Sequence, residues 1–230
     1  MKTLGLIGGT GPESTIEYYR LIVAKYREQA DGHGPPVIIT SIDLQRMIDW
    51  MAAGDLAGVA DGLTAEFERL HRAGADLAAL TANTAHIVFD EVQRRSPIPL
   101  ISMIEAIREE TQARGLKRVG LFGTRYTMQA PFYPDVFARA GIKIVLPSGT
   151  EQDYVHNVYL GELLKDVFLP ASRANLLAIA DEMKRRDNIE GLILGGTELP
   201  ILLRADEHNG IPLLDTTRIH VNKLVTEMLR

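Results

Sequence analysis

Three short segments in the first half of the chain recur in the second half, in the same order and at nearly one spacing. The pairs, with offsets of 115, 114 and 113 residues, are 2–8 with 117–123, 80–84 with 194–198, and 98–102 with 211–215. The first pair reads Lys-Thr-Leu-Gly-Leu-Ile-Gly and Lys-Arg-Val-Gly-Leu-Phe-Gly. This period is far too long for a solenoid. The pattern predicts two copies of one α/β unit, related by a pseudo-two-fold axis.

Short apolar runs alternate with amphipathic helical stretches along all 230 residues. The runs that we expect to be strands are residues 4–7, 37–41, 77–80, 99–101, 119–122, 142–146, 191–194 and 212–214. Between them, apolar residues recur every three or four positions, as in Leu56, Val59, Leu63, Phe67 and Leu70, which is typical of a helix with one buried face. Uniformly apolar strands separated by helices indicate parallel sheets covered on both sides. We therefore predict an α/β fold with two similar four-stranded parallel sheets.

The repeat also predicts the domain organisation. Each copy ends in a helical stretch after its Ile-Pro-Leu segment, at residues 103–114 and 216–229. We expect residues 1–100 to form an N-terminal domain, on which residues 217–230 pack back, and residues 101–216 to form the second domain. A ligand cleft is expected between the two.

Composition excludes several classes of function. The net charge is −5, so no basic field is available to hold a nucleic acid. No apolar run approaches the length of a membrane helix, and a strand-like run starts at Leu4 without room for a signal peptide. These features predict a cytoplasmic protein without nucleic-acid or membrane partners. The chain has no cysteine, so neither a disulfide nor a thiol nucleophile is available. The sequence also lacks metal-ligand spacings, so we expect no metal site.

Small polar loops follow four of the expected strands. They cover residues 8–14, 81–86, 123–128 and 195–198, and are rich in Gly, Thr and Asn. Ligands of parallel sheets bind beyond the carboxyl ends of the strands, and helix N-termini there favour anions. The loops therefore predict a site for a carboxylate or a phosphate.

The first loop has other interpretations. Gly8-Gly-Thr-Gly11 resembles a nucleotide loop, but neither Gly-Lys-Ser/Thr nor a third glycine at the required spacing follows. Thr10-Gly-Pro-Glu13 also fits a capping box, so Glu13 is as consistent with helix capping as with catalysis. Asn83 and Thr197 could likewise be helix caps, although they occupy equivalent places in the two copies.

Four side chains near the loops could act as acids or bases. They are Glu13, His86, Glu198 and His220, and Thr81 could serve as a proton relay. His86 and His220 are also consistent with positions inside helices. Sequence alone leaves these alternatives open.

At these loops the sequence resembles the aspartate/glutamate racemase family, whose members racemise amino acids without a cofactor. The matching motifs are Gly8-Gly-Thr-Gly-Pro-Glu-Ser-Thr15, Ala82-Asn-Thr-Ala-His86, Gly123-Thr-Arg-Tyr-Thr-Met128 and Gly196-Thr-Glu-Leu-Pro200. The resemblance covers essentially the whole chain, including the duplication. It implies that two cysteine thiols exchange the α-proton on opposite faces of the substrate. At the two cysteine positions this chain has Ala82 and Gly196, so both thiols are absent.

The resemblance also implies which residues bind the substrate. It assigns the α-carboxylate and amino group to loop residues, and the side-chain carboxylate to two cations. The residues so assigned are Gly9, Thr10, Asn83, Thr84, Thr124, Thr127 and Thr197 in the loops, and Arg46 and Lys165 as the cations. No cofactor is implied, the partner is a small amino acid or dicarboxylate, and a homodimer is expected.

Three functions stay open at this point. The first is an isomerase that interconverts the L- and D-forms of an acidic amino acid with acids and bases other than cysteine. The second is related carbon-acid chemistry on another carboxylate. The third is a protein that binds an amino acid or dicarboxylate without turnover.

Overall fold

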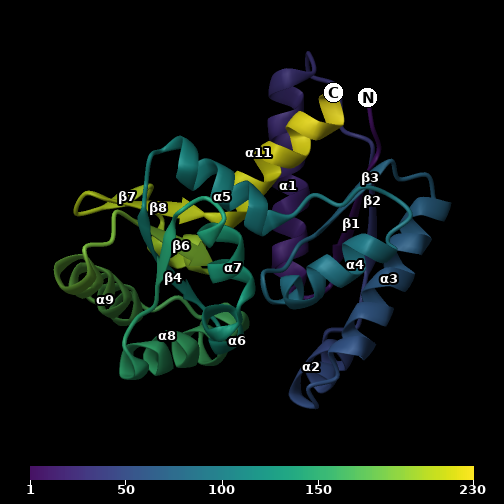
Figure 1. Ribbon diagram of the computed structural model, residues 1–230. Coiled ribbons are helices and arrows are strands. Elements are labelled where there is room, and N and C mark those ends of the chain that lie inside the picture. The colour runs from purple at the N-terminus through teal and green to yellow at the C-terminus, as the bar shows by residue number, and fades with distance from the viewer. The chain divides into compact units, whose positions relative to one another are not determined.

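The computed structural model describes residues 1–11 and 13–230 with their side chains, and residue 12 only as the first residue of a helix. The chain divides into two compact units. Unit 1 comprises residues 1–106 and 217–230, and unit 2 comprises residues 107–216 (Figure 1).

Unit 1 is built on a three-stranded parallel sheet in the order β2-β1-β3. Leu4 of β1 lies opposite Val37 of β2 and Leu77 of β3. The elements of unit 1 are β1 (Leu4–Gly8), α1 (Pro12–Gln29), β2 (Val37–Ser41), α2 (Leu44–Ala52), α3 (Leu56–Arg72), β3 (Leu77–Leu80), the 3-10 helix η1 (Thr84–Val88), α4 (Phe89–Arg95) and α11 (Thr216–Leu229). Helix α5 (Met103–Ala113) starts in unit 1 and ends in unit 2.

The prediction of a fourth strand at residues 99–101 is wrong. Only Leu100 bridges to Ala78, through hydrogen bonds of 2.9 Å from Ala78 N to Pro99 O and from Ile101 N to Ala78 O. Pro99 takes part through its carbonyl only, and α5 begins at Met103. The pairing covers one residue, which is too short for a strand.

Helix α3 supplies much of the core of unit 1. Its residues Val59, Leu63, Phe67 and Leu70 are buried, as the periodicity predicts, whereas Leu56 at the start of the helix is 40% exposed. The side chain of Asp55 caps this helix by accepting a hydrogen bond of 2.9 Å from Gly58 N. An apolar face of this kind, rather than helix propensity, holds a surface helix on its sheet.

Both ends of the chain contribute to unit 1. Helix α11 lies beside α1 (Figure 1), and the hydroxyl of Tyr18 on α1 is 2.9 Å from Nδ1 of His220 on α11. The amide of Lys2 also donates to the carbonyl of Met228 at 2.9 Å. The last helix is therefore part of the unit that the first strand begins.

Unit 2 contains the larger set of paired strands, in the order β5-β4-β6-β8-β7. Its elements are β4 (Arg118–Gly123), α6 (Arg125–Gln129), α7 (Phe132–Ala138), β5 (Lys143–Val145), α8 (Gly149–Gly161), the 3-10 helix η2 (Leu163–Lys165), α9 (Pro170–Asp187), β6 (Gly191–Gly195), α10 (Leu199–Leu203), β7 (Glu207–His208) and β8 (Ile211–Asp215). All neighbours pair in parallel except β7, which is antiparallel to β8. The expected count of four strands is therefore corrected to five.

The extra strand β7 comes from a tight hairpin. His208 pairs with Ile211 across the two-residue loop Asn209-Gly210, whose residues have φ values of 49° and 73°. Two consecutive residues with positive φ are the geometry that Asn-Gly favours in hairpins. The dipeptide was therefore an available signal for this strand.

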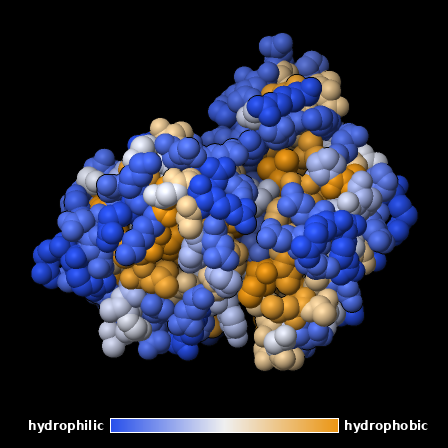
Figure 2. Space-filling model, in the orientation of Figure 1, coloured by the Kyte–Doolittle hydropathy of each residue, from blue (hydrophilic) through white to orange (hydrophobic). Residues whose placement is uncertain are grey.

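The visible surface is largely hydrophilic, with apolar side chains gathered in smaller areas over both units (Figure 2). Among the described residues, no helix combines the length and hydropathy needed to cross a membrane. In the same part of the chain, no three His, Asp or Glu side chains gather as metal ligands do.

Candidate active site

The loop after β1 is tightly packed around Gly9. This residue has φ of 87°, and a Cβ atom there would lie 2.5 Å from Ile42 O and 2.6 Å from the hydroxyl oxygen of Ser41. Only glycine fits such a position without strain. The hydroxyl oxygen of Thr10 is buried and has no hydrogen-bond partner. It is thus able to bond a ligand that reaches this loop.

Helix α1 is not capped as the sequence suggested. The residue at its N-cap is Gly11, and no side chain makes a capping hydrogen bond, so the predicted capping box of Thr10 and Glu13 is wrong. Glu13 is exposed in the first turn of the helix. An acidic residue there interacts favourably with the helix dipole.

The loop after β3 places Ala82, Asn83 and Thr84 at the start of η1. Asn83 is 5% exposed and occupies the N-cap position without making a capping bond, while Ala82 and Thr84 are half-buried. Thr81 is fully buried, and its hydroxyl donates to Ile7 O at 3.0 Å. The hydroxyl proton of Thr81 is therefore used in a hydrogen bond to β1, which argues against a role as a proton relay.

His86 has both ring nitrogens engaged inside unit 1. The amide of Met103 donates to Nε2 at 3.2 Å, so Nδ1 carries the proton and bonds to Ala82 O at 3.0 Å. The ring stacks on Phe89 with 5.0 Å between centroids. Burial lowers the pKa of His86 to about 4. This geometry favours a neutral residue that supports the Ala82 loop over an acid or base.

His220 is similarly occupied. Its Nε2 donates to Ile101 O at 3.0 Å, so Nδ1 accepts from the hydroxyl of Tyr18. Burial, with a smaller contribution from the charge of His86, lowers the pKa of His220 to about 3. The residue is fully buried and joins α1, α11 and the segment before α5. It too is better suited to holding unit 1 together than to proton transfer.

In unit 2, the loop after β4 places two threonines together. Thr124 caps α6, and its hydroxyl oxygen accepts from Thr127 N at 3.2 Å. Thr127 is fully buried, with its hydroxyl 3.2 Å from that of Thr124. Both groups lie at the carboxyl end of β4, where a parallel sheet holds its ligands.

The loop after β6 carries a buried carboxylate. Glu198 is 5% exposed, and one of its oxygens, Oε2, accepts hydrogen bonds from the hydroxyls of Thr197, at 2.9 Å, and Tyr159. Neither bond uses the second oxygen, Oε1. Thr197 is half-buried and precedes the N-cap of α10, which is Glu198 itself. Of the four acid–base candidates, Glu13 is exposed and the two histidines have both ring nitrogens engaged, so Glu198 is the buried candidate that fits proton transfer best.

Sequence reasoning missed Tyr159. This residue lies on α8, 6% exposed, and reaches the loop after β6 from 39 residues away in the sequence. A Cβ atom at Gly196 would lie 2.5 Å from the Tyr159 hydroxyl oxygen and 2.6 Å from Cζ. The phenol therefore occupies the space that any side chain at position 196 would need. A buried tyrosine on a helix gives no sequence signal of this contact.

The two expected cations are exposed. Arg46 lies on α2 of unit 1, with its guanidinium 4.5 Å from the centre of the Trp50 ring, and Lys165 ends η2 in unit 2. The structure gives neither residue a carboxylate partner among the described ion pairs.

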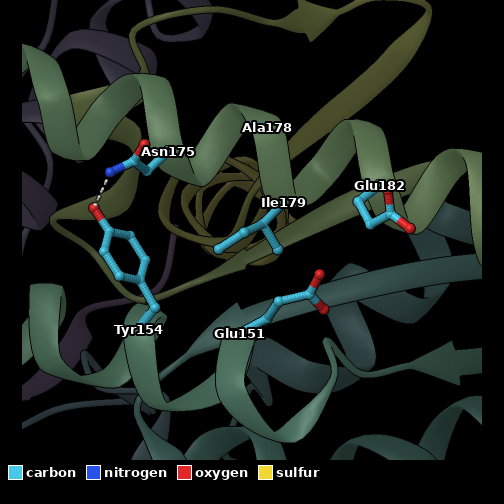
Figure 3. Close-up of a pocket in the computed structure, with 6 residues that line it drawn as sticks. All are labelled: Glu151, Tyr154, Asn175, Ala178, Ile179 and Glu182. Carbon is cyan, nitrogen blue, oxygen red and sulfur yellow. Dashed lines mark hydrogen bonds between the residues drawn. The ribbon is translucent and has the colours of Figure 1, made fainter.

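A separate hollow of about 370 Å³ lies between α8 and α9 (Figure 3). It is lined by Glu151, Tyr154, Asn175, Ala178, Ile179 and Glu182. None of the site residues expected from the sequence lines it. Its two carboxylates are already paired, Glu151 with Arg186 and Glu182 with Arg185.

The protein is an α/β protein with two units built on parallel strands. In proteins of this class, ligands bind at the loops beyond the carboxyl ends of the strands. The chain belongs to the Asp/Glu/Hydantoin racemase family, whose model matches residues 7–224. This confirms the family expected from the loop motifs, in a member without cysteine.

Individual relatives support the same assignment. The chain is 26% identical over 148 residues to the broad specificity amino-acid racemase RacX of Bacillus subtilis, an alignment that covers 62% of this chain and 63% of RacX. It is similar to a proposed Asp/Glu racemase from Yersinia pestis, with 31% identity and a TM-score of 0.93. It is also similar to an aspartate racemase homologue from Pyrococcus horikoshii, with 33% identity and a TM-score of 0.86. Both structural alignments cover 100% of each chain.

Proposed function

We propose that the protein is an amino-acid racemase-type isomerase that exchanges the α-proton of aspartate or glutamate without a cofactor. Its family supports this reaction, as do relatives named as a broad specificity amino-acid racemase and a glutamate racemase. The single observation that carries the proposal for a chain without thiols is the buried carboxylate of Glu198 at the end of β6.

Glu198 is the base in this proposal. The Cα–H bond breaks, its electron pair stays on Cα and spreads into the substrate carboxyl group, and the proton passes to Oε1 of Glu198. The proton on Oε1 exchanges with water, and a solvent-derived proton then returns from Oε1 to Cα as the O–H bond breaks. Return to the original face gives exchange with solvent alone. Inversion requires that a water molecule protonates the opposite face of Cα, and the hydroxide so formed takes the proton held on Oε1. Acid–base catalysis by a positioned side chain contributes roughly 10²–10⁴-fold to a rate.

The polar loop residues bind the substrate in this proposal. In unit 1 we assign ligand contacts to Gly9, Thr10, Asn83 and Thr84. The buried hydroxyl oxygen of Thr10, which has no hydrogen-bond partner, supports the assignment of Thr10. In unit 2 we assign them to Thr124, Thr127 and Thr197. Arg46 and Lys165 are the cations proposed for the side-chain carboxylate, since an acidic substrate requires a positive partner.

Exchange and inversion can be measured separately. Purified protein is incubated with L- and D-aspartate and glutamate in D2O, the α-proton signal is followed by NMR, and the enantiomers are separated by chiral chromatography. We expect loss of the α-proton signal, and a rate about 100-fold lower in Glu198→Gln with ligand affinity retained. The matched control is Glu182→Gln, a glutamate of the same unit that pairs with Arg185.

Two results would contradict the proposal. Unchanged exchange in Glu198→Gln would remove Glu198 as the base. Ligand binding by calorimetry without any exchange would instead support an amino-acid or dicarboxylate binding protein, or carbon-acid chemistry on another carboxylate.

A further inference from the structure

Tyr159 contacts the proposed base from another helix. Its hydroxyl donates to Oε2 of Glu198, and its ring fills the space beside Gly196. Tyr159 and Glu198 are 6% and 5% exposed, so the bond is shielded from water. A charge-assisted hydrogen bond is stronger in such surroundings than at the surface.

The chemical state of the phenol follows from its surroundings. Burial, followed by the negative charge of Glu198, raises the pKa of Tyr159 well above its ordinary value of 10. The hydroxyl therefore keeps its proton at neutral pH. It acts as a permanent donor and is not itself a base.

The hydrogen bond from Tyr159 restricts the orientation of the Glu198 carboxylate, which matters for proton transfer. Thr197 and Tyr159 both donate to the same oxygen, Oε2, and so fix the plane of the carboxylate. Oε1 is left as the oxygen that takes part in neither bond. A base gains most when its reacting atom is held in one orientation before the substrate arrives.

We propose that Tyr159 is a positioning residue, whose hydroxyl aims Oε1 of Glu198 at the substrate and whose ring requires glycine at position 196. This inference rests on the proposed function, in which Glu198 removes the α-proton. The proposal explains both the buried hydrogen bond between Tyr159 and Glu198 and the glycine at position 196. A side chain at position 196 would displace the ring and with it the orientation of Glu198.

The first test separates catalysis from binding. In Tyr159→Phe the ring stays and only the hydroxyl is lost. We expect kcat for α-proton exchange to fall at least about tenfold, the loss typical of one hydrogen bond to a charged group, while KM changes less than about threefold. The control is Tyr154→Phe. The hydroxyl oxygen of this tyrosine of α8 accepts a hydrogen bond of 2.8 Å from the Asn175 side chain (Figure 3), and loss of the hydroxyl should leave kcat unchanged.

The second test measures the steric claim without activity. Gly196→Ala puts a methyl group into the phenol and should lower Tm by about 5 °C, as overpacking does in a protein of this size. In a Tyr159→Leu background, which removes the hydroxyl and Cζ, the same substitution should lower Tm by less than about 1 °C. Equal losses in the two backgrounds would overturn the claim that the ring requires glycine.

The outcomes distinguish the two proposals. An active wild type whose kcat is unchanged in Tyr159→Phe overturns the positioning role and leaves the proposed function standing. A wild type without exchange on any of the four substrates overturns the proposed function, and with it the catalytic part of this inference. The comparison of Tm losses caused by Gly196→Ala in the wild-type and Tyr159→Leu backgrounds then still tests whether the Tyr159 ring requires glycine at position 196.

Discussion

Acid should destabilise unit 1 through its two buried histidines. Burial lowers the pKa of His86 to about 4 and that of His220 to about 3, whereas an unfolded chain protonates histidine near 6.5. Below pH 6.5 the two histidines are therefore protonated in the unfolded state but stay neutral in the folded state. Stability is fully present above pH 6.5 and is lost as the pH falls toward the folded pKa values.

The size of this effect can be worked out from the two shifts. Each proton taken up on unfolding changes stability by about 1.4 kcal/mol per pH unit, so two histidines give a slope of about 2.7 kcal/mol per unit. Between pH 6.5 and 4.5 unit 1 should lose about 5 kcal/mol, which approaches the total stability of many domains. Carboxylates of an unfolded chain take up protons at about pH 4, below this window, so we attribute the slope to the two histidines.

Urea unfolding at several pH values measures the slope directly. His86→Gln and His220→Gln should each remove about one proton, and so about half of the slope, whatever their effect on stability at pH 7. His33→Gln, at an exposed position, is the matched control and should leave the slope unchanged. A wild-type slope near zero, or slopes unaffected by both buried substitutions, would refute this account.

Three further predictions concern the loops. Gly9→Ala should destabilise unit 1 by at least about 2 kcal/mol in urea unfolding, because φ is positive and a backbone carbonyl occupies the Cβ position; a loss below about 0.5 kcal/mol would show that the loop can open. Thr124→Ala should cost about 1 kcal/mol through loss of the α6 cap, measured in the same way, and Thr124→Ser should restore it. Cysteines at the two positions implied by the family resemblance, introduced with Ala82→Cys and Gly196→Cys, should give racemase activity no higher than that of the wild type unless Tyr159→Leu clears the space, as chiral chromatography would show; a gain in the double variant would contradict the steric argument.

Periodicity predicted the parallel strands well because a buried parallel strand is apolar along its whole length. Two strand predictions failed. Residues 99–101 form one bridge although the equivalent residues 211–215 form β8, and Asn209-Gly210 forms a hairpin whose two-residue strand has no apolar run of its own. The hairpin signal is present in the sequence, but it is carried by two residues rather than by a pattern.

The site was less predictable than the fold because its key contacts join distant segments. His86 and His220 resemble catalytic histidines until Met103 and Ile101 are seen to occupy their ring nitrogens. Tyr159 and Glu198 are 39 residues apart, and no spacing rule links a residue on one helix to the loop after a later strand. Loop motifs identify where chemistry occurs, whereas burial and hydrogen bonds decide which residue performs it.

The chain path through unit 1 has a consequence for protein synthesis. Residues 1–106 leave the ribosome before residues 107–216, and α11, whose His220 contacts Tyr18 of α1, follows both. Translation of the intervening and final segments takes roughly 6–25 s at ordinary elongation rates of about 5–20 residues per second. During that interval unit 2, which is continuous in sequence, can fold while Tyr18 on α1 still lacks its contact with α11. Nascent chains should therefore depend on chaperones until the last helix emerges, and a stop codon before residue 216 should yield a folded second unit attached to an aggregation-prone first one.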